Sequence, residues 1–454
     1  MTEKYVNKVI VILGASFAGM TCAQKLRQLN PNWDIVLIDK EIHPDYVPNG
    51  LNWYYRHEIS GLNQAMWQTE EEQRLQNIRC LFGLKVEKIN KEDRELMLSD
   101  GSSVYYDQLI CAMGSQAEST YIDGADAQGV LTTKTYATSQ NAKQVLDKSH
   151  KVAVVGAGII DLDIAYSLHE SGKAVTLLEA QERPDFRHTD PDMSLPLLDA
   201  MAESKLHFFQ NQKVEKITVT REEKLCLQTL TGDTFTVDAV ILAVNFRPDS
   251  RLLTGLVDLS VDNSVVVNDY FQTSDPNIYA IGDLIWSYFK GLNSAYYMPL
   301  INQAIRSAQM LAYHLSGHAV PKLKITRATG SKHFGYYRAN IGLTELEAGL
   351  YEDTVSVTYF PKEQYDLRIK LIANQKTGHL LGAQLISKEN CLATANQLVQ
   401  AISCDMTDFD LAFQDFIYTA RESEMAYMLH QAARAQHPIS GTEEKHSYEA
   451  NFLN

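Results

Sequence analysis

Two glycine-rich turns are the most informative chemical features of this sequence. The first, GASFAG, places Gly14, Ser16 and Gly19 at the spacing of a turn that faces a diphosphate. The second, GAGIID, begins at Gly156 and ends at Asp161. In such a turn the first glycine permits a tight bend, and the amides of the following helix face the phosphates. Two turns of this kind therefore predict two bound nucleotides.

An acidic residue follows each turn at the distance expected for ribose recognition. Asp39 closes the apolar run DIVLID about 20 residues beyond Gly19, and Glu179 closes AVTLLE after the second turn. A carboxylate here accepts hydrogen bonds from ribose hydroxyls and repels a 2′-phosphate, which favours NAD over NADP at the second turn. Arg183 weakens this preference, because a nearby arginine can accommodate a 2′-phosphate.

Each turn lies between an apolar run and a helical pattern, and these elements must position it. KVIVIL (residues 8–13) and KVAVV (residues 151–155) are typical of parallel strands that are buried on both faces. After the second turn, apolar residues at Ile160, Ile164 and Leu168 follow the spacing of a helix. One such turn is also compatible with ordinary packing of a helix on a strand, so the interpretation depends on the second copy.

Composition limits the classes of protein and site to which the chain can belong. Its 454 residues, 45% hydrophobic, suffice for two or three globular domains, and a net charge of −15 argues against a nucleic-acid surface. No apolar stretch reaches about 18 residues and the N-terminus lacks a signal-peptide pattern, so we expect a cytoplasmic protein without membrane association. Six cysteines without a CxxC pair and 13 histidines without HExxH predict no metal site.

Three further segments make the sequence resemble a known family. LICAMGS (residues 109–115), AVILAVNFRPDS (residues 239–250) and NIYAIGD (residues 277–283) resemble, in order and spacing, the strand-and-turn signatures of FAD-dependent pyridine nucleotide-disulfide oxidoreductases. From about residue 6 to 436 the chain is similar to the branch that contains NADH oxidase, NADH peroxidase and coenzyme A-disulfide reductase. The resemblance implies an α/β fold with two Rossmann-like domains, for FAD and NAD, and a C-terminal α+β dimerisation domain.

The resemblance also implies domain boundaries and a homodimer. The FAD-binding domain is expected in two parts, residues 1–117 and 247–320, with an NAD(P)H-binding domain at residues 118–246 inserted between them. The dimerisation domain is expected at residues 321–436, and the polar tail at 437–454 is expected to be mobile.

Cofactor-contacting residues follow from the matched motifs. Asp283 is expected to bind the ribityl chain of FAD, and the helix that begins near Pro299 is expected to lie under the isoalloxazine. The residues expected around FAD are Gly14, Ser16, Phe17, Ala18, Gly19, Asp39, Lys40, Asn49, Val86, Ala112, Gly114, Gly282, Asp283, Pro299, Leu300 and Ile301. Those expected around NADH are Gly156, Gly158, Ile159, Ile160, Glu179 and Asn245. Tyr418 is expected either to reach the active site or to be an aromatic core residue.

The segment DYVPNGLNW (residues 45–53) departs from the family pattern at the position of chemistry. In redox-active relatives a segment of the type S-F-L-S-C-G places one cysteine at a helix N-terminus against the flavin, where the dipole favours a thiolate. Aligned without gaps, that cysteine falls on Asn49, whose carboxamide cannot form a sulfenic acid or a mixed disulfide. Those relatives also commonly carry a histidine where this chain has Phe17. Both losses predict that sulfur chemistry has been abandoned.

Two roles for Asn49 remain open from the sequence. Asparagine is among the best helix N-caps, so the residue is interpreted first as a cap. Its amide would also be able to hydrogen-bond reduced flavin or a substrate, which makes Asn49 the candidate catalytic residue.

The second nucleotide unit departs from the family pattern as well. Asp161 replaces the third glycine, which adds bulk where helix meets strand and a negative charge near the expected diphosphate. Asp163 stands in place of the usual glutamate, and Asn245 replaces the glycine of A-x-G-x-R-P. Competent binding of NADH is therefore an open question at this stage.

Three functions follow from these residues. The first is an FAD-dependent NAD(P)H oxidase that passes electrons from NADH through the flavin to O2, giving H2O2, or to another small acceptor. The second is a degenerate FAD-binding protein with a structural or partner-binding role and no nicotinamide turnover. The third, a membrane-surface NADH:quinone reductase, is disfavoured by the acidic C-terminal tail.

Overall fold

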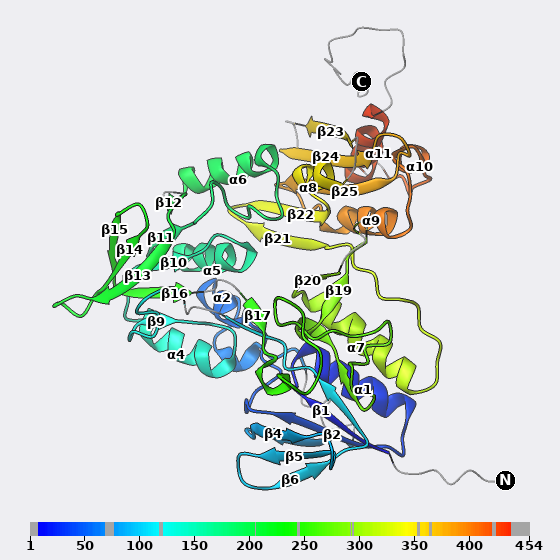
Figure 1. Cartoon of the computed structure of the whole chain (residues 1–454). Coiled ribbons are helices and arrows are strands. Elements are labelled where there is room, and N and C mark those ends of the chain that lie inside the picture. Colours follow the sequence, from blue (N-terminus) through cyan, green and yellow to red (C-terminus); the bar gives the residue numbers. More distant parts are fainter. Residues whose placement is uncertain are drawn as a thin grey trace. The chain divides into compact units, whose positions relative to one another are not determined.

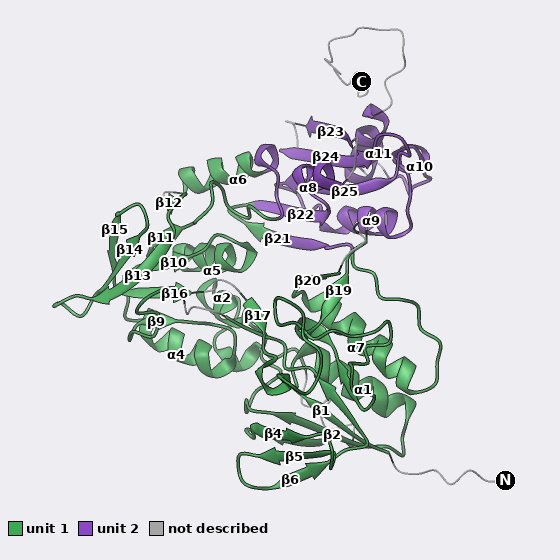
Figure 2. Ribbon diagram, viewed as in Figure 1, with its two compact units in different colours: residues 1–187, 194–325, 332–335 green, residues 188–193, 326–331, 336–454 purple. Residues whose placement is uncertain are grey.

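The computed structural model divides the chain into two compact units (Figure 2). It describes residues 8–68, 77–117, 121–204, 206–242, 246–290, 292, 295–351, 355–362, 366–419 and 424–436. Unit 1 consists of residues 1–187, 194–325 and 332–335. Unit 2 consists of residues 188–193, 326–331 and 336–454.

A five-stranded parallel sheet carries the first glycine turn in unit 1 (Figure 1). Its order is β18 (Ile278–Ala280), β7 (Gln108–Cys111), β1 (Val9–Leu13), β2 (Asp34–Asp39) and β3 (Arg79–Phe82). Val11 pairs with Val36 on one side and Leu109 on the other, which places β1 in the interior of the sheet. Helices α1 (Phe17–Leu29) and α7 (Ile301–Leu315) pack on each other.

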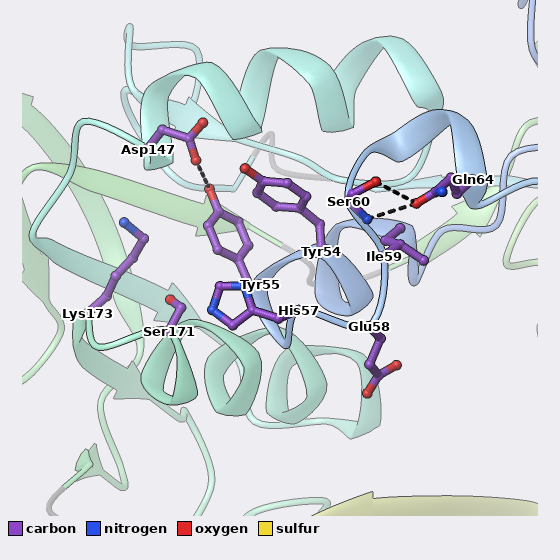
Figure 3. A pocket seen from close by; sticks show the side chains of 10 residues that line it. All are labelled: Tyr54, Tyr55, His57, Glu58, Ile59, Ser60, Gln64, Asp147, Ser171 and Lys173. Atoms are coloured by element: carbon purple, nitrogen blue, oxygen red, sulfur yellow. Dashed lines mark hydrogen bonds between the residues drawn. The ribbon is translucent and has the colours of Figure 1, made fainter.

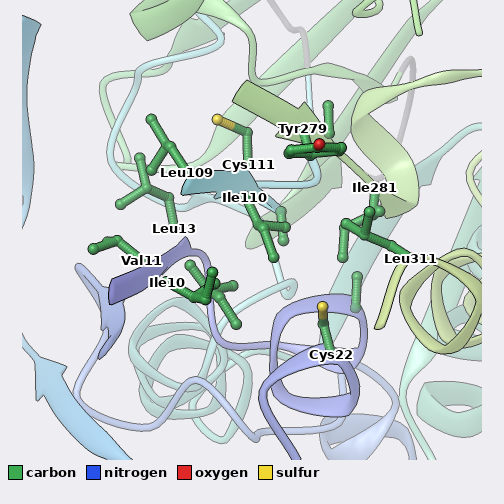
Figure 4. Close-up of a cluster of buried hydrophobic side chains, with 14 of the residues drawn as sticks. Ile10, Val11, Leu13, Cys22, Leu109, Ile110, Cys111, Tyr279, Ile281 and Leu311 are labelled. Atoms are coloured by element: carbon green, nitrogen blue, oxygen red, sulfur yellow. The ribbon is translucent and has the colours of Figure 1, made fainter. Parts of the chain in front are cut away.

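Apolar side chains on both faces of this sheet form a hydrophobic core in unit 1. Figure 4 shows Ile10, Leu13 and Ile110 among neighbours from α1, β18 and α7, and the exposed fraction of each of these three is at most 2%. Burial of each such side chain stabilises the fold by roughly 1.5–3 kcal/mol. The core therefore holds the end of β1 rigidly, and the glycine turn begins at that end.

A second parallel sheet in unit 1 repeats this arrangement around the second glycine turn. Its order is β12 (His207–Phe209), β11 (Ala174–Leu178), β10 (Lys151–Val155), β16 (Ala239–Leu242) and β9 (Val130–Leu131). The turn follows β10 and leads into α5 (Ile159–Glu170), which packs on β10 and β11. The other helices of this region are α4 (Tyr136–Leu146) and α6 (Pro191–Glu203), whose residues from 194 onward belong to unit 1.

Short elements complete unit 1. The helix α2 (Gly50–Tyr55) packs on α5 and α4. Two antiparallel sheets have three strands each: one consists of β4 (Val86–Asn90), β5 (Glu95–Leu98) and β6 (Ser103–Tyr105), and the other of β13 (Val214–Val219), β14 (Leu225–Thr229) and β15 (Thr234–Val237). Two further antiparallel pairs are β8 (Ser115–Ala117) with β17 (Phe246–Pro248) and β19 (Trp286–Tyr288) with β20 (Ala295–Tyr297). Single 3-10 turns are η1 (Leu62–Gln64), η2 (Arg251–Leu253) and η3 (Gly282–Leu284).

Unit 2 is built on a five-stranded sheet. The order is β21 (Thr329–His333), β22 (Tyr336–Gly342), β25 (Leu380–Ser387), β24 (Leu367–Asn374) and β23 (Val355–Lys362). Its helices are α8 (Glu345–Tyr351), α9 (Leu392–Ser403), α10 (Asp408–Phe413) and α11 (Glu424–Ala435). The last two residues of β21 and the turn after it, Lys332–Gly335, belong to unit 1.

These observations confirm the predicted fold class, because each of two parallel sheets carries a glycine turn between a strand and a helix. The predicted domain boundaries stay predictions, and the polar tail lies outside the described residues. Among the helices that the structure describes, none combines the length and apolarity that a membrane crossing requires.

Candidate functional site

Close backbone contacts explain the glycines of the first turn. A Cβ atom on Gly14 would lie 2.3 Å from the carbonyl oxygen of Ala112, and one on Gly19 would lie 1.7 Å from the carbonyl oxygen of Gly14. A Cβ on Gly282 would lie 2.9 Å from the Cβ of Ala18. The structure therefore brings together five residues that were predicted to surround FAD, and any side chain at these glycines would separate the elements.

The predicted ribose acid is held against the turn. Asp39 Oδ2 accepts a hydrogen bond from the backbone N–H of Ala15 at 2.7 Å, and its Oδ1 accepts one from Glu41 at 2.8 Å. Burial raises the pKa of Asp39, and these two amide donors oppose that rise. The carboxyl group therefore orients the turn, and its contact with ribose stays a prediction.

The first turn leaves amide donors for an anion. No described residue accepts a hydrogen bond from the backbone N–H of Ser16, which precedes α1. The first turn of α1 also contains no acidic residue. A helix N-terminus with a free amide attracts negative charge, so this part of the site fits the diphosphate of FAD.

The histidine position of the family is occupied by a stacked aromatic pair. The rings of Phe17 and Trp67 are stacked with their centroids 5.1 Å apart. Phe17 also packs against the core around β1, so the described contacts of this side chain are structural.

Asp283 lies within a polar group that the motifs did not reveal. Its carboxyl group accepts a hydrogen bond from the backbone N–H of Leu300 and lies 3.4 Å from Ser115 Oγ. Lys134 Nζ donates to the carbonyl oxygen of Ser115 and, at 2.7 Å, to its Oγ. Burial raises the pKa of Asp283 and lowers that of Lys134, and each charge partly offsets the shift of the other. Lys134 was missed because it lies in the loop before α4, where no local pattern marks it.

The other residues predicted around FAD have plainer surroundings. Val86 begins β4 and is buried in the core, and Gly114 has a φ of 68° in the turn after β7. Lys40 is exposed and lies 3.9 Å from Asp249, and the exposed fraction of Ile301, at the start of α7, is 46%. Pro299 lies in the loop before α7 and is partly buried.

The second turn repeats the geometry of the first at its ribose acid. Glu179 Oε2 accepts a hydrogen bond from the backbone N–H of Ala157 at 2.7 Å, and its Oε1 accepts one from Gln181 at 2.8 Å. Gly156 has a φ of 104°, and Gly158 is the residue before α5. In the first turn of α5, Ile159 is partly buried and Ile160 is exposed.

Asp161 distinguishes the second turn from the first. Its Oδ2 accepts a hydrogen bond from the backbone N–H of Gly158 at 3.0 Å, and its exposed fraction is only 5%. Burial raises the pKa of Asp161 well above the usual range, and the charge of Glu179 adds to this rise. The side chain therefore points into the turn. Asn245 lies outside the described residues.

Asn49 does not have the capping role assigned to it first. It lies immediately before α2, but its side chain accepts no hydrogen bond from an amide of that helix. Its Nδ2 instead donates to Asp163 Oδ2 on α5 at 2.7 Å. The capping interpretation of the side chain is therefore wrong: the hydrogen bond from Nδ2 to the Asp163 carboxylate fixes the orientation of the amide, and in that orientation Oδ1 accepts no backbone N–H of α2.

Asp163 is the centre of a polar cluster. Asn52 Nδ2 donates to Oδ2 at 2.6 Å, Arg56 Nη1 donates to Oδ1 at 2.6 Å, and His333 Nε2 lies 3.5 Å from Oδ1. Burial alone would raise the pKa of Asp163, but His333, Arg56 and Asn52 hold it well below its usual range. Sequence reasoning missed Asn52, Arg56 and His333 because these residues belong to no motif and meet only after folding.

An open hollow of about 730 Å³ lies elsewhere in unit 1 (Figure 3). Its lining includes Tyr55, whose Oη donates to Asp147 Oδ1 at 3.0 Å, and Lys173, which follows the C-terminal end of α5. The second glycine turn is at the opposite, N-terminal end of α5, and no predicted site residue lines the hollow. The hollow is therefore not the predicted nucleotide site.

The cysteines and Tyr418 complete the set of predicted features. All six cysteines are described and are free thiols, and none lies on α2 or α5. Burial raises the pKa of the Cys111 thiol to about 12, which disfavours a thiolate. Tyr418 has an exposed fraction of 69%, so the aromatic-core interpretation is wrong. Its reach to an active site stays a prediction.

Comparisons with known proteins agree with this geometry. A family model described as pyridine nucleotide-disulphide oxidoreductase matches residues 8–309. The chain is 25% identical to an NADH oxidase of Enterococcus faecalis over 423 residues, which cover 90% of this chain and 95% of that protein. It is 24% identical to a coenzyme A disulfide reductase of Staphylococcus aureus, with 89% and 95% covered. A crystal structure of a pyridine nucleotide-disulfide family oxidoreductase from Enterococcus faecalis V583 superposes with a TM-score of 0.80, at 29% identity, and covers 94% of this chain and 99% of that one.

Proposed function

The chain belongs to the pyridine nucleotide-disulphide oxidoreductase family, and we propose that it is an NADH oxidase-like enzyme without a cysteine intermediate. Family membership confirms the predicted class, an FAD-dependent oxidoreductase that uses a nicotinamide nucleotide. In the proposed reaction, electrons pass from NADH through the flavin to O2, giving H2O2, or to another acceptor.

The observation that carries this proposal is the amide at position 49. Asn49 replaces the expected sulfur, and its Nδ2 is held by Asp163 at 2.7 Å. Because that hydrogen bond orients the amide, Oδ1 is the group left to accept a hydrogen bond from a ligand. None of the six cysteines lies on α2 or α5, which supports a mechanism without a thiol. A thiol intermediate is therefore not expected.

The residues of the first turn fit FAD. Gly14 and Gly19 allow the turn to pack closely on its own backbone neighbours. The amide of Ser16 is available to a phosphate, and Asp283 is available to a ribityl hydroxyl. FAD would supply the capacity to accept a hydride from a nicotinamide and to pass electrons on to an acceptor. The protein groups bind and orient it, and Lys134 adds a positive charge beside Asp283.

We propose a homodimer formed through unit 2. Aromatic and aliphatic side chains are exposed in and after α10, and their exposed fractions are 56% for Phe409, 63% for Phe413, 87% for Ile417 and 69% for Tyr418. Soluble monomers seldom expose so many large apolar side chains in one short segment, so this segment supports an interface between two copies.

An anaerobic titration of the FAD-loaded protein with NADH tests the proposed enzyme. Loss of the oxidised-flavin absorbance at about one NADH per flavin, followed by its return with H2O2 formation on admission of O2, is the expected result. An unchanged spectrum at saturating NADH would contradict the proposal.

A second function is favoured by one observation, the hydrogen bond between Asp161 and Gly158. A carboxylate in the nucleotide turn supports a degenerate flavoprotein that keeps FAD for stability or partner binding and turns over no nicotinamide. In the same titration such a protein would retain its yellow colour at every NADH concentration.

A further inference from the structure

The two glycine turns provide an internal comparison within one chain. In both turns, the backbone N–H of the residue after the first glycine donates a hydrogen bond to a carboxylate at the end of the adjacent strand. The distance is 2.7 Å in each case. They differ at the next amide. That of Ser16 has no acceptor among the described residues, whereas that of Gly158 donates to Asp161 Oδ2 at 3.0 Å.

The carboxyl group of Asp161 lies where a phosphate oxygen is expected in a turn of this kind. A Cβ on Gly158 would be 3.2 Å from Asp161 Oδ2, so the carboxyl group covers the open face of this glycine. That face is the one that close approach of a diphosphate requires. A carboxylate oxygen on a helix N-terminal amide makes the same contact as a phosphate oxygen.

Asp161 caps the Gly158 amide through Oδ2, but its second carboxyl oxygen is left without a partner. The exposed fraction of Asp161 is only 5%, yet its Oδ1 has no hydrogen-bond partner among the described residues. A buried, unpartnered carboxyl oxygen is costly, and a ligand or a proton would relieve that cost. Binding of a ligand or a proton at this carboxyl group is therefore favoured.

We propose that Asp161 determines the affinity of the second turn for dinucleotides, because its side chain holds the diphosphate position and must release the Gly158 amide before a dinucleotide binds. This inference rests on the proposed use of a nicotinamide nucleotide at this turn. Asp161 is a specificity-determining residue here, and it takes no part in electron transfer.

The charge of the site makes this affinity depend on pH. Glu179 faces Asp161 from the end of β11, and the following loop carries Arg183 and Asp185, whose backbone N–H donates to the carbonyl oxygen of Ala157. Burial raises the pKa of Asp161, so its neutral form is populated at higher pH than that of an exposed aspartate, and its share grows as pH falls. A neutral carboxyl group does not repel a diphosphate, so affinity increases as pH falls.

The test measures binding of ADP-ribose, which carries the diphosphate but no nicotinamide, to FAD-saturated protein by calorimetry. Saturation with FAD keeps the first turn occupied. Asp161→Gly removes the carboxyl group and Asp161→Asn removes only its charge. We expect Asp161→Gly to tighten binding by about 10- to 100-fold, the range for one charge-assisted hydrogen bond, and Asp161→Asn to tighten it less. The wild-type Kd should fall as pH is lowered, and the Asp161→Asn Kd should not change with pH.

A matched control is Glu170→Gln, which makes the same charge change at the exposed C-terminal end of α5. It should leave both the Kd and its pH dependence unchanged. Equal Kd values for wild type, Asp161→Gly and Asp161→Asn would overturn the inference, as would a tightening in Glu170→Gln of the same size. If ADP-ribose binding tightens while NADH reduces no flavin in any variant, the inference stands and the proposed oxidase function fails.

Discussion

Replacing Asp163 by alanine should destabilise unit 1 more than any other single change in the cluster around α2. The substitution removes the acceptor of Asn49, Asn52 and Arg56 at once, at distances of 2.6–2.7 Å. It also leaves the guanidinium of Arg56, whose side chain is only 18% exposed, without its nearest carboxylate.

The expected magnitude follows from these contacts. A hydrogen bond to a charged group contributes about 1.5–3 kcal/mol, and removal of one partner of a buried ion pair costs about 3–5 kcal/mol. The loss is smaller here because Arg56 retains Glu58 at 2.8 Å and Ser167 at 2.9 Å, and water can replace some contacts at the partly exposed Asn49. We therefore expect Asp163→Ala to lower the free energy of unfolding by about 2–4 kcal/mol.

Urea unfolding of the FAD-saturated protein, followed by tryptophan fluorescence, measures this loss, since Trp53 lies on α2. A double-mutant cycle with Asn49→Ala should give a coupling free energy of about 1–2 kcal/mol between residues 49 and 163. The matched control is Asp147→Ala, which removes the hydrogen-bond acceptor of Tyr55 at the C-terminal end of α2. The Asp147 side chain is 39% exposed, so water can replace the lost contact. It should cost no more than about 1 kcal/mol. A loss below about 0.5 kcal/mol for Asp163→Ala would refute the reasoning.

The remaining predictions concern pH, FAD, the missing sulfur and assembly. Because the folded protein lowers the pKa of Asp163, its stabilisation is present above the unfolded carboxyl pKa of about 4 and is lost as pH falls through the folded pKa, so acid titrations of wild type and Asp163→Asn should converge at low pH. Asp283→Ala should raise the Kd for FAD by about 10- to 100-fold through loss of one hydrogen bond to a buried acid, measured by flavin fluorescence on reconstitution. Wild-type oxidase activity should yield H2O2 stoichiometric with NADH and should persist after thiol alkylation. Asn49→Cys should gain peroxidase activity only partially, because Asp163 faces that position and Phe17 supplies no imidazole. Reduction of H2O2 by wild type at enzymic rates would contradict both expectations. Light scattering should show a dimer at micromolar concentration, and Phe413→Glu should shift it toward monomer, because the exposed ring cannot then be buried against a second copy.

Much of the scaffold was predictable from the sequence because local sterics and periodicity determine it. Continuous apolar runs such as residues 8–13 specify strands that are buried on both faces, and a glycine whose φ is positive, as at Gly14, specifies the turn that follows. Order and spacing of the motifs were sufficient to identify the family. The replacement of the redox cysteine by Asn49 and of a turn glycine by Asp161 was equally visible, since each is a change of residue type at a matched position.

Only the tertiary structure decided what these side chains contact. Asn49 was first interpreted as a cap, and its true partner, Asp163, is 114 positions away on α5. The other partners of that carboxylate include His333, which reaches it from the end of β21. Lys134 likewise meets Ser115 only because strands and loops from different parts of the chain pack together. Such contacts depend on how distant segments are placed relative to one another. Side-chain packing and desolvation determine that placement, and a local sequence pattern predicts neither packing nor desolvation.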